Sequence, residues 1–416
     1  MNDAALPFDP EMLDRLAEVT VRVGLNLQPG QDLLMTADLE TLPLARRIAA
    51  AAYKAGARLV TPLFADEDMI VARYEHAPDE SFDAAPGWLY EGMAKAFEGN
   101  TARLAIKGDN PMMLASQDPA KVARAGKAGS IAAKPAMEPI TTFAINWSIV
   151  AYPGLGWARQ VFPGLPDEEA VARLADAIFE ASRVKTPDPV AAWAEHNAAL
   201  RARREWLNEM CFDALHYTGP GTDFTLGLAQ GHEWKGGSSV SKNGVTCNPN
   251  IPTEEVFTTP HAQRADGTLR ATKPLAHQGS LIEDIEVRFE GGKIVEARAS
   301  RGEDVFLKLI DTDEGARRLG EVALVPHGSP ISQSGVLFYN TLFDENAASH
   351  VALGQCYSDC FTDPGQSAES LAAAGGNSSL IHVDWMIGSN RIDIDGLDAD
   401  GNRTPVMRAG EWAHSL

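Results

Sequence analysis

The sequence has few cysteines, no long apolar run and no excess of positive charge, and each absence excludes a class of protein. Its 416 residues contain four cysteines, whose number and spacing favour neither a disulfide framework nor a structural zinc site. No apolar run of about 18 residues is present, so no membrane span is expected. Residues 1–7 lack the basic and apolar regions of a signal peptide. We therefore expect a cytoplasmic protein with no membrane partner.

The charge is strongly acidic, with 57 Asp and Glu against 36 Lys and Arg and a formal net charge of −21. Such a surface repels phosphate backbones, so no nucleic-acid partner is expected. A hydrophobic content of 44% and a charged content of 22% are normal for a folded globular protein. The length favours two domains rather than one.

The first two hundred residues predict alternating strands and helices. Asp9 is a plausible helix N-cap because Pro10 follows it. Strands are expected over 31–35, 58–64, 101–107 and 142–152, and helices over 10–25, 42–56 and 66–75. This alternation is typical of an α/β domain with a mostly parallel sheet. No glycine-rich nucleotide motif follows any of these strands.

The pattern changes after two further helices, expected over 167–182 and 190–210. Short alternating runs follow at 216–218, 223–228, 279–289 and 293–299, and Gly291-Gly292 indicates a hairpin between the last two. We expect an α/β domain over 1–208 and an α+β domain over 209–416 with mainly antiparallel strands.

The segment 379–388 is an apolar, strand-like run that contains His382 and Asp384. Residues two apart on a strand point to the same face, so these side chains should project side by side. A carboxylate in apolar surroundings is costly unless it is paired, hydrogen-bonded or bound to a metal. On this segment alone, a buried hydrogen-bonded pair and a metal site are equally good interpretations.

Other acidic residues of the same half lie in similar surroundings. Glu254 and Glu255 precede a short apolar run, and Glu321 begins a strand-like run. Each taken alone favours a solvated surface position. Glu345 and His350 follow in a segment, 339–354, that has the pattern of a helix start. Five residues correspond to about 140° of helical rotation, so the two share no helical face unless the helix begins or breaks between them.

Together these residues form a candidate metal site in the second domain. The possible ligands are Glu255, Glu321, Glu345, His350, His382 and Asp384, enough for two metal ions. Carboxylate and imidazole ligands without thiolates suit Zn, Co, Mn or Mg. Paired metals bridged by a carboxylate are typical of hydrolases that include aminopeptidases. His232, His261 and His327 are better explained as surface or supporting residues.

Several of these segments resemble the aminopeptidase T family of metallopeptidases, which includes the PepS-type enzymes. The segments that carry the resemblance are 252–258, 321–325, 344–350 and 382–384, together with 150–153 and 157–163 in the first domain. The resemblance extends over essentially the whole chain, and no motif position departs from the family pattern.

The resemblance implies a cytosolic, homodimeric exopeptidase that releases N-terminal amino acids from peptides at two metal ions held by the six residues above. The first domain would then shape the dimer and its enclosed chamber. The resemblance also marks Tyr357 as an active-site residue, which could hydrogen-bond the tetrahedral oxyanion. Glu321 is the expected bridging ligand, and Glu254 a candidate general base. Which of Glu254 and Glu255 is the ligand stays open, with motif spacing favouring Glu255.

Two other functions compete with this one. Ring-cleaving dioxygenases acting on hydroxylated pyridines are similar to this family, and two histidines with one carboxylate suffice for mononuclear Fe(II). One iron has no need of six protein ligands, which disfavours that function. The other alternative is a non-catalytic dimer that a bound metal ion merely stabilises.

Overall fold

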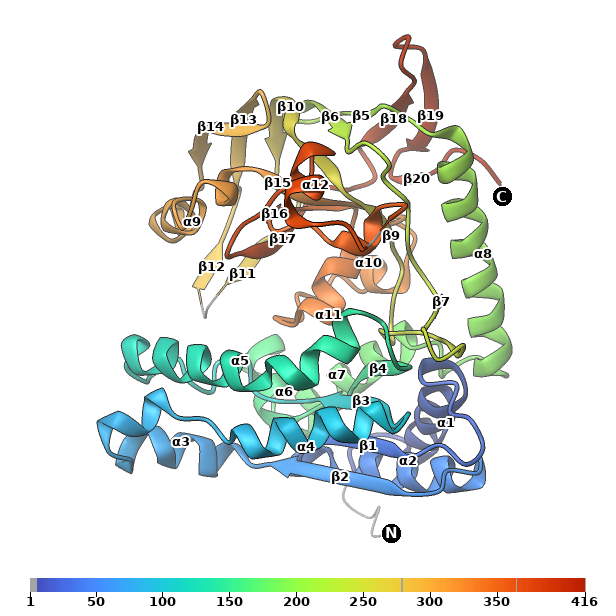
Figure 1. The fold of residues 1–416 in the computed structure, drawn as a ribbon, viewed down its shortest axis with the longest axis vertical. Helices are drawn as coiled ribbons and strands as arrows, with labels where there is room; N and C mark the ends of the chain where they lie inside the picture. The colour runs from blue at the N-terminus through green and yellow to red at the C-terminus, as the bar shows by residue number, and fades with distance from the viewer. Residues whose placement is uncertain (1–5, 278–279, 364, 416) are drawn as a thin grey trace. The chain divides into compact units, whose positions relative to one another are not determined.

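A computed structural model of the protein describes residues 6–277, 280–363 and 365–415 (Figure 1). The chain forms two compact units: unit 1 is Met1–Glu195 with Ser238–Pro252, and unit 2 is His196–Gly237 with Thr253–Leu416. The expected boundary at 208 and the observed one at 195 both fall inside helix α8 (Pro189–Met210). A continuous helix carries no linker pattern that would mark a boundary. The sequence also does not predict that 238–252 returns to unit 1.

Unit 1 contains a four-stranded sheet in the order β2-β1-β3-β4. All neighbouring strands are parallel, which confirms the predicted α/β architecture. The strands are β1 (Leu33–Asp38), β2 (Val60–Ala65), β3 (Ala102–Lys107) and β4 (Trp147–Ala151). The strand expected from 142 begins only at Trp147, because the preceding helix continues to Thr141 and Phe143 then turns with φ 54°.

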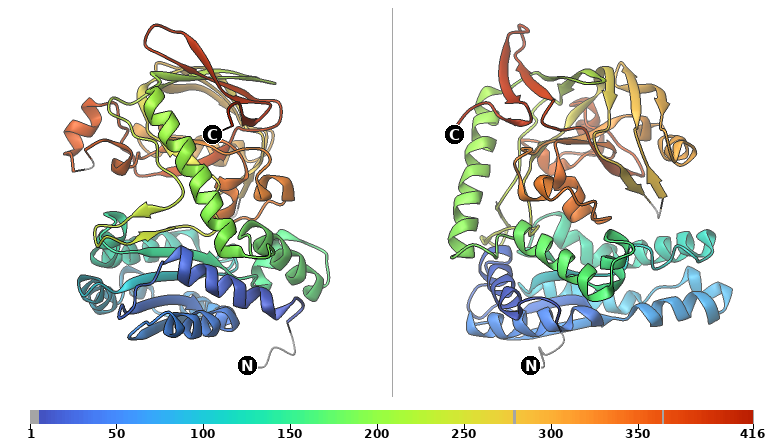
Figure 2. Two further views of the ribbon diagram at one scale, coloured as in Figure 1. Left: turned by 90° about the vertical axis from the view of Figure 1, so that its right-hand side faces the viewer. Right: turned by 180° about the vertical axis from the view of Figure 1, so that it is seen from behind.

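The helices of unit 1 connect these strands. Asp9 caps the first one as predicted, since its side chain accepts a hydrogen bond from the Glu11 N–H. Helices α4 and α5 pack against each other, and they lie side by side in Figures 1 and 2. The helices are α1 (Pro10–Val19, continued by a π-helical turn, Thr20–Gly24), α2 (Leu42–Lys54), α3 (Glu67–His76), α4 (Gly87–Glu98), α5 (Pro119–Thr141), α6 (Leu155–Val161) and α7 (Asp167–Ala181). The returning segment adds the short strands β7 (Ser239–Val240) and β8 (Thr246–Cys247).

Unit 2 is built on an antiparallel sheet of eight strands in the order β14-β13-β10-β6-β5-β18-β19-β20. The predicted hairpin at Gly291-Gly292 is confirmed, and both glycines have positive φ. The strands are β5 (Ala214–Gly219), β6 (Thr222–Leu228), β10 (Pro260–Arg270), β13 (Glu286–Glu290), β14 (Lys293–Arg298), β18 (Asp393–Leu397), β19 (Arg403–Arg408) and β20 (Glu411–Trp412).

A second antiparallel sheet of unit 2, in the order β17-β16-β15-β9, carries the candidate site. Its strands are β9 (Val256–Thr258), β15 (Leu319–Leu324), β16 (His350–Gly354) and β17 (His382–Met386). Strand β15 is buried along its whole length. Both sheets contribute to one core, in which Phe224, Val322, Val351 and Trp385 are fully or almost fully buried.

The remaining elements of unit 2 are short. The strand expected over 279–289 is divided into β12 (Ser280–Ile282) and β13, because Asp284 turns with φ 53° between them; Gly279 lies outside the described residues. The other elements are β11 (Leu275–His277), α9 (Glu303–Ile310), α10 (Pro330–Ser334), α11 (Thr341–Asp344) and α12 (Ala368–Ala373).

Two further findings concern the described residues. All four cysteines are free thiols. The helices there are either too short or too polar to cross a membrane.

Candidate metal centre

The pairing of β15, β16 and β17 brings four predicted ligands to one face of the small sheet. Glu321 pairs with Ala352, and Ala352 pairs with Asp384, so these three side chains form one row across the strands. His350 lies two residues before Ala352, and His382 two before Asp384. Since side chains two apart on a strand share a face, both histidines project beside the two carboxylates.

Ala352 provides the space between these side chains. It lies between Glu321 and Asp384 in the row, and its side chain is a single methyl group. A larger residue there would occupy the volume into which the two carboxylates point. The small residue therefore leaves room for ligand atoms to converge over β16.

Glu255 reaches the same face from the edge strand. Phe257 of β9 pairs with Ala323 of β15, and Glu255 lies two residues before Phe257. Its Oε2 is 3.3 Å from Nε2 of His350. The strand register therefore adds a third carboxylate to the cluster.

Glu321 lies between the two histidines. Its Oε1 is 4.0 Å from Nε2 of His350, and its Oε2 is 3.2 Å from Nε2 of His382. Oδ1 of Asp384 is 3.9 Å from Nε2 of His350 and 3.6 Å from Nε2 of His382. Two groups of potential ligands result, Glu255/Glu321/His350 and Glu321/His382/Asp384, and Glu321 belongs to both.

Backbone carbonyls fix the orientation of both imidazole rings. Nδ1 of His350 is 3.1 Å from the carbonyl oxygen of Ala348, and Nδ1 of His382 is 2.7 Å from that of Gln355. With Nδ1–H donating to these carbonyls, Nε2 of each ring is directed at the carboxylates. Metal-binding histidines in proteins are typically held in this way.

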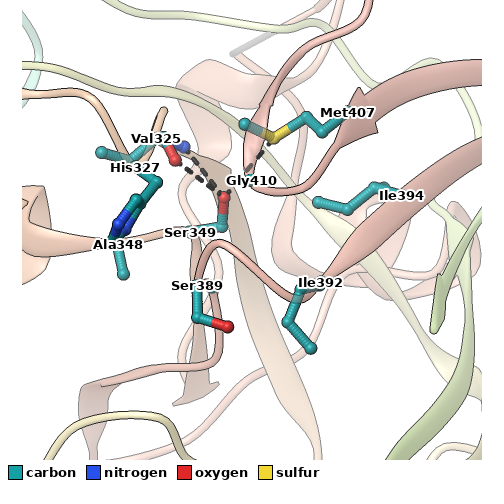
Figure 3. Close-up of a pocket in the computed structure, with 10 residues that line it drawn as sticks. Val325, His327, Ala348, Ser349, Ser389, Ile392, Ile394, Met407 and Gly410 are labelled. Atoms are coloured by element: carbon teal, nitrogen blue, oxygen red, sulfur yellow. Dashed lines mark hydrogen bonds between the residues drawn. The ribbon is translucent and has the colours of Figure 1, made fainter. Parts of the chain in front are cut away.

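Ser349 secures the start of β16 next to the site. Its hydroxyl accepts a hydrogen bond from the Val325 N–H, and it lies 3.1 Å from the Val325 carbonyl oxygen and 3.6 Å from the sulfur of Met407 (Figure 3). These contacts line a cavity of about 10 Å³, room for about one water molecule. The cavity is too small for a substrate, and the contacts attach β16 to the end of β15.

Burial and mutual repulsion shift the acid–base properties of the cluster. Burial first, and then the charges of Asp384 and Glu255, raise the pKa of Glu321 to about 7. Burial acts to lower the pKa of His350, but the close Glu255 carboxylate, 3.3 Å away, and the charges of Asp384 and Glu321 outweigh burial and raise the pKa to about 9. His382 is likewise raised to about 9 despite burial, mainly by its hydrogen bond to Glu321. The cluster thus holds protons at neutral pH, which a metal ion would displace.

Glu345 lies near enough to feel the charges of the cluster, but among the described residues it belongs to neither group of potential ligands. The helix start expected within 339–354 is α11, which ends at Asp344; a 3₁₀ turn covers Glu345–Ala347, and His350 begins β16. This break removes the angular conflict between Glu345 and His350. Burial, followed by the charges of Glu255, Asp384 and Glu321, raises the pKa of Glu345 well above its usual range.

Tyr357 and Glu254 lie near the cluster. The ring centroid of Tyr357 is 4.7 Å from that of His382, and Tyr357 is 47% exposed. Glu254 is buried rather than at the surface, its N–H donates to Oδ1 of Asn346 at 2.7 Å, and its Oε2 is 3.6 Å from Nε2 of His196. Glu254 and Glu255 therefore face different histidines.

The remaining histidines singled out in the sequence, 232, 261 and 327, belong to neither ligand group of the described chain. His232 contacts the carbonyl oxygen of Ala229, and His327 lines the small cavity. The structure adds Ala352 and Ser349 to the residues that shape the site. Neither carries a chemical signal in the sequence.

The donor set fits divalent metal ions. Oε2 of Glu255 and Oδ1 of Asp384 are buried, and within the described part of the chain neither accepts a hydrogen bond. The ion pairs of Glu255, Glu321 and Asp384 are all with the two histidines, again among described residues. Oxygen and imidazole ligands in a buried, acidic setting suit Zn²⁺, Mn²⁺ or related ions.

Comparison with known proteins points the same way. The family model described as thermophilic metalloprotease (M29) matches residues 9–412. Aminopeptidase T of Thermus thermophilus is 54% identical over 96% of this chain and 98% of its own, and aminopeptidase PepS of Streptococcus thermophilus is 41% identical over 98% and 99%.

Two solved structures match this chain over nearly its whole length. The structure of wild-type AmpT from Thermus thermophilus matches with a TM-score of 0.92 at 53% identity, over 97% of this chain and 99% of that one. That of 2,5-dihydroxypyridine dioxygenase from Pseudomonas putida matches with a TM-score of 0.58 at 13% identity, over 98% and 99%. The second likeness is one of fold alone.

Proposed function

This chain belongs to the M29 family of thermophilic metalloproteases and is a metal-dependent aminopeptidase, and from that premise we propose that it cleaves peptides at a centre of two divalent metal ions. The observation that carries the proposal is the position of Glu321, whose two carboxylate oxygens face two different histidines. A carboxylate so placed is suited to bridge a metal pair.

The proposed ligands are the five residues of the two groups, Glu255, Glu321, His350, His382 and Asp384, together with Glu345. Four carboxylates with two neutral imidazoles carry four negative charges, which two divalent cations would balance. Deep burial of Glu321 and His350 supports this count, because uncompensated charges in such a place are costly. The matching of charge favours two ions over one.

Held by these residues, a metal pair would supply an activated water molecule at neutral pH and a Lewis acid for the scissile carbonyl. The chain supplies the orientation: the carbonyl oxygens of Ala348 and Gln355 hold the histidine rings. Although the residue is 47% exposed, desolvation of its buried part and then the surrounding carboxylates raise the pKa of Tyr357, so its phenol stays protonated. We propose that this hydroxyl donates a hydrogen bond to the oxyanion of the tetrahedral intermediate.

Glu254 is the candidate general base. Its main chain is held by Asn346, and its carboxylate lies beside His196 rather than His350. A carboxylate next to the ligands, but outside both ligand groups, could accept the proton of the attacking water. Glu255 then serves as the metal ligand, as the motif spacing favours.

The proposed substrates are peptides with a free N-terminus, because the relatives that this chain resembles over nearly its whole length are named aminopeptidases. We also propose a cytoplasmic homodimer in which unit 1 takes part in assembly. The resemblance to the aminopeptidase T family carries this part of the proposal.

Hydrolysis of leucine p-nitroanilide tests the proposal. Chelation should abolish the release of p-nitroaniline, and Zn²⁺ or Co²⁺ should restore it. Metal analysis of the restored enzyme should give two ions per chain. The absence of metal-dependent release from any unblocked aminoacyl substrate would refute the function, and oxygen uptake with Fe(II) and a dihydroxypyridine would favour the dioxygenase instead.

A further inference from the structure

Unit 1 contains a cavity that the proposed peptidase site does not use. Its volume is about 370 Å³, within the range of small-molecule pockets. It lies between one face of the parallel sheet and helices α4 and α5. Side chains from these helices, Leu89, Tyr90, Met93, Ala136, Met137 and Ile140, form a mostly apolar wall.

The cavity lies where this kind of sheet commonly binds ligands. In the order β2-β1-β3-β4, the strand that follows β1 in sequence is added on one side of it, and the strand that follows β3 is added on the other side. The topological switch point of the sheet therefore lies between β1 and β3. The cavity is lined by the C-terminal halves of both, including Thr36 and Asp38 of β1 and Ala105 and Lys107 of β3, and it extends to Arg103 near the start of β3. Open parallel sheets bind ligands at this location for geometric reasons alone.

Arg103 introduces an unbalanced positive charge into the cavity. It pairs in register with Leu34, which places its side chain on the same sheet face as Thr36, Asp38 and Ala105. Arg103 is partly buried, and its Nε is buried without a hydrogen-bond partner among the described residues. Burial lowers its pKa to about 10. A guanidinium is an obligate donor, so such a group calls for an anion.

Asp38 gives the other end of the cavity the opposite sign. Arg103 pairs with Leu34, and Asp38 lies four residues after Leu34 on β1. The backbone positions of Asp38 and Arg103 are therefore separated along the strands by about 13 Å, at ~3.3 Å per residue. Burial first, and then the charge of Asp109, raise the pKa of Asp38. Glu67 adds to this negative field and Lys107 only partly offsets it. The small side chains of Thr36 and Ala105 form the floor between the two charged ends.

We propose that this cavity binds a small zwitterion with an apolar side chain, its carboxylate held by Arg103 and its ammonium group by Asp38. A free amino acid and a short peptide share this chemistry. The apolar wall from α4 and α5 would take the side chain. This inference rests on unit 1 alone and does not depend on the peptidase activity.

Calorimetric titration of the metal-loaded enzyme with L-leucine tests the proposal. Arg103→Met should weaken one binding event about 10- to 100-fold, the loss expected for a charge-assisted hydrogen bond. Arg46→Met, at an exposed position on α2, is the matched control and should leave binding unchanged. Because removal of an unpaired buried charge is often neutral or stabilising, Arg103→Met should fold and keep wild-type hydrolysis.

Analogues and a second variant identify the groups that are recognised. 4-Methylpentanoate lacks the amine and isoamylamine lacks the carboxylate, so both should bind more weakly than leucine. Asp38→Asn should weaken leucine binding but not 4-methylpentanoate binding. Titration of the Glu321→Gln enzyme with leucyl-leucine, where turnover is suppressed, shows whether the peptide or the amino acid is preferred.

Three results would overturn the proposal. Leucine could bind Arg103→Met as tightly as wild type, or 4-methylpentanoate could bind as tightly as leucine. Alternatively, light scattering could show that Arg103→Met changes the oligomeric state. That would mean that a second copy of the chain supplies the missing anion.

Discussion

Substitution of Glu321 by Gln tests the centre most directly, because Gln keeps the volume and removes only the charge. The carboxylate lies 4.0 Å from one ligand imidazole and 3.2 Å from the other. We expect metal content to fall from two ions per chain to one or none. The value of kcat/KM should fall by at least ~100-fold, equivalent to about 3 kcal/mol of transition-state stabilisation.

The same substitution should have the opposite effect on stability when no metal is bound. The pKa of Glu321 is raised from 4.5 to about 7, which at about 1.4 kcal/mol per unit corresponds to a folding cost on the order of 3 kcal/mol. Since the folded state retains this proton, the cost is absent below pH 4.5 and complete above pH 7. Metal-free Glu321→Gln should therefore melt several degrees above metal-free wild type at pH 8.

With metal bound, wild type should instead melt above Glu321→Gln, because only wild type gains the full free energy of metal binding. Inductively coupled plasma mass spectrometry measures the metal content, and initial rates give kcat/KM. Calorimetry with and without chelator measures the melting temperature. Glu314→Gln, an exposed exchange in the same unit, should change none of them. Two retained metals with full activity, or a metal-free variant that melts below metal-free wild type, would refute the reasoning.

The other predictions concern the surroundings of Glu321. Without metal, calorimetry should show stability falling as the pH rises from about 6.5 to 9, because the two site histidines have pKa values raised to about 9 and lose their stabilising protons across this interval; metal-loaded enzyme should lack this slope. Ala352→Val should lower metal content while circular dichroism stays native, since valine favours strands but fills the space between the carboxylates. Tyr357→Phe should lower kcat about 100-fold with metal content unchanged, as expected for loss of an oxyanion donor. Glu255→Gln should lower metal content, whereas Glu254→Gln should lower kcat alone.

The sequence predicts the position of a site residue where the local residue pattern also determines the residue's surroundings in the fold. The two-residue spacing of His382 and Asp384 predicts a shared strand face, and β17 has that geometry. Glu321 was likewise placed at the start of a strand, which is β15. Its burial could not be inferred, because a lone glutamate in a strand looks like a surface residue until the neighbouring strands are known.

The segment before His350 shows the limit of local information. Ala347, Ala348 and Ser349 follow a real helix start and have no strong strand propensity. Pairing with β15 and β17 makes the next residues a strand, so tertiary contacts override local preference. The same holds for 238–252, whose return to unit 1 leaves no compositional trace.

The clustering of these carboxylates links folding to metal binding. Glu255, Glu321 and Asp384 lie together because strand register places them there, and histidines are their only ion-pair partners among the described residues. Without metal the fold must hold protons to limit repulsion, at a cost that grows with pH. A ligand that binds only the folded state contributes RT ln(1 + [L]/Kd) to stability, about 4 kcal/mol at a thousandfold excess over Kd. Bound metal would therefore offset the cost of assembling its own site, and resistance to heat should depend on free metal concentration as much as on the hydrophobic core.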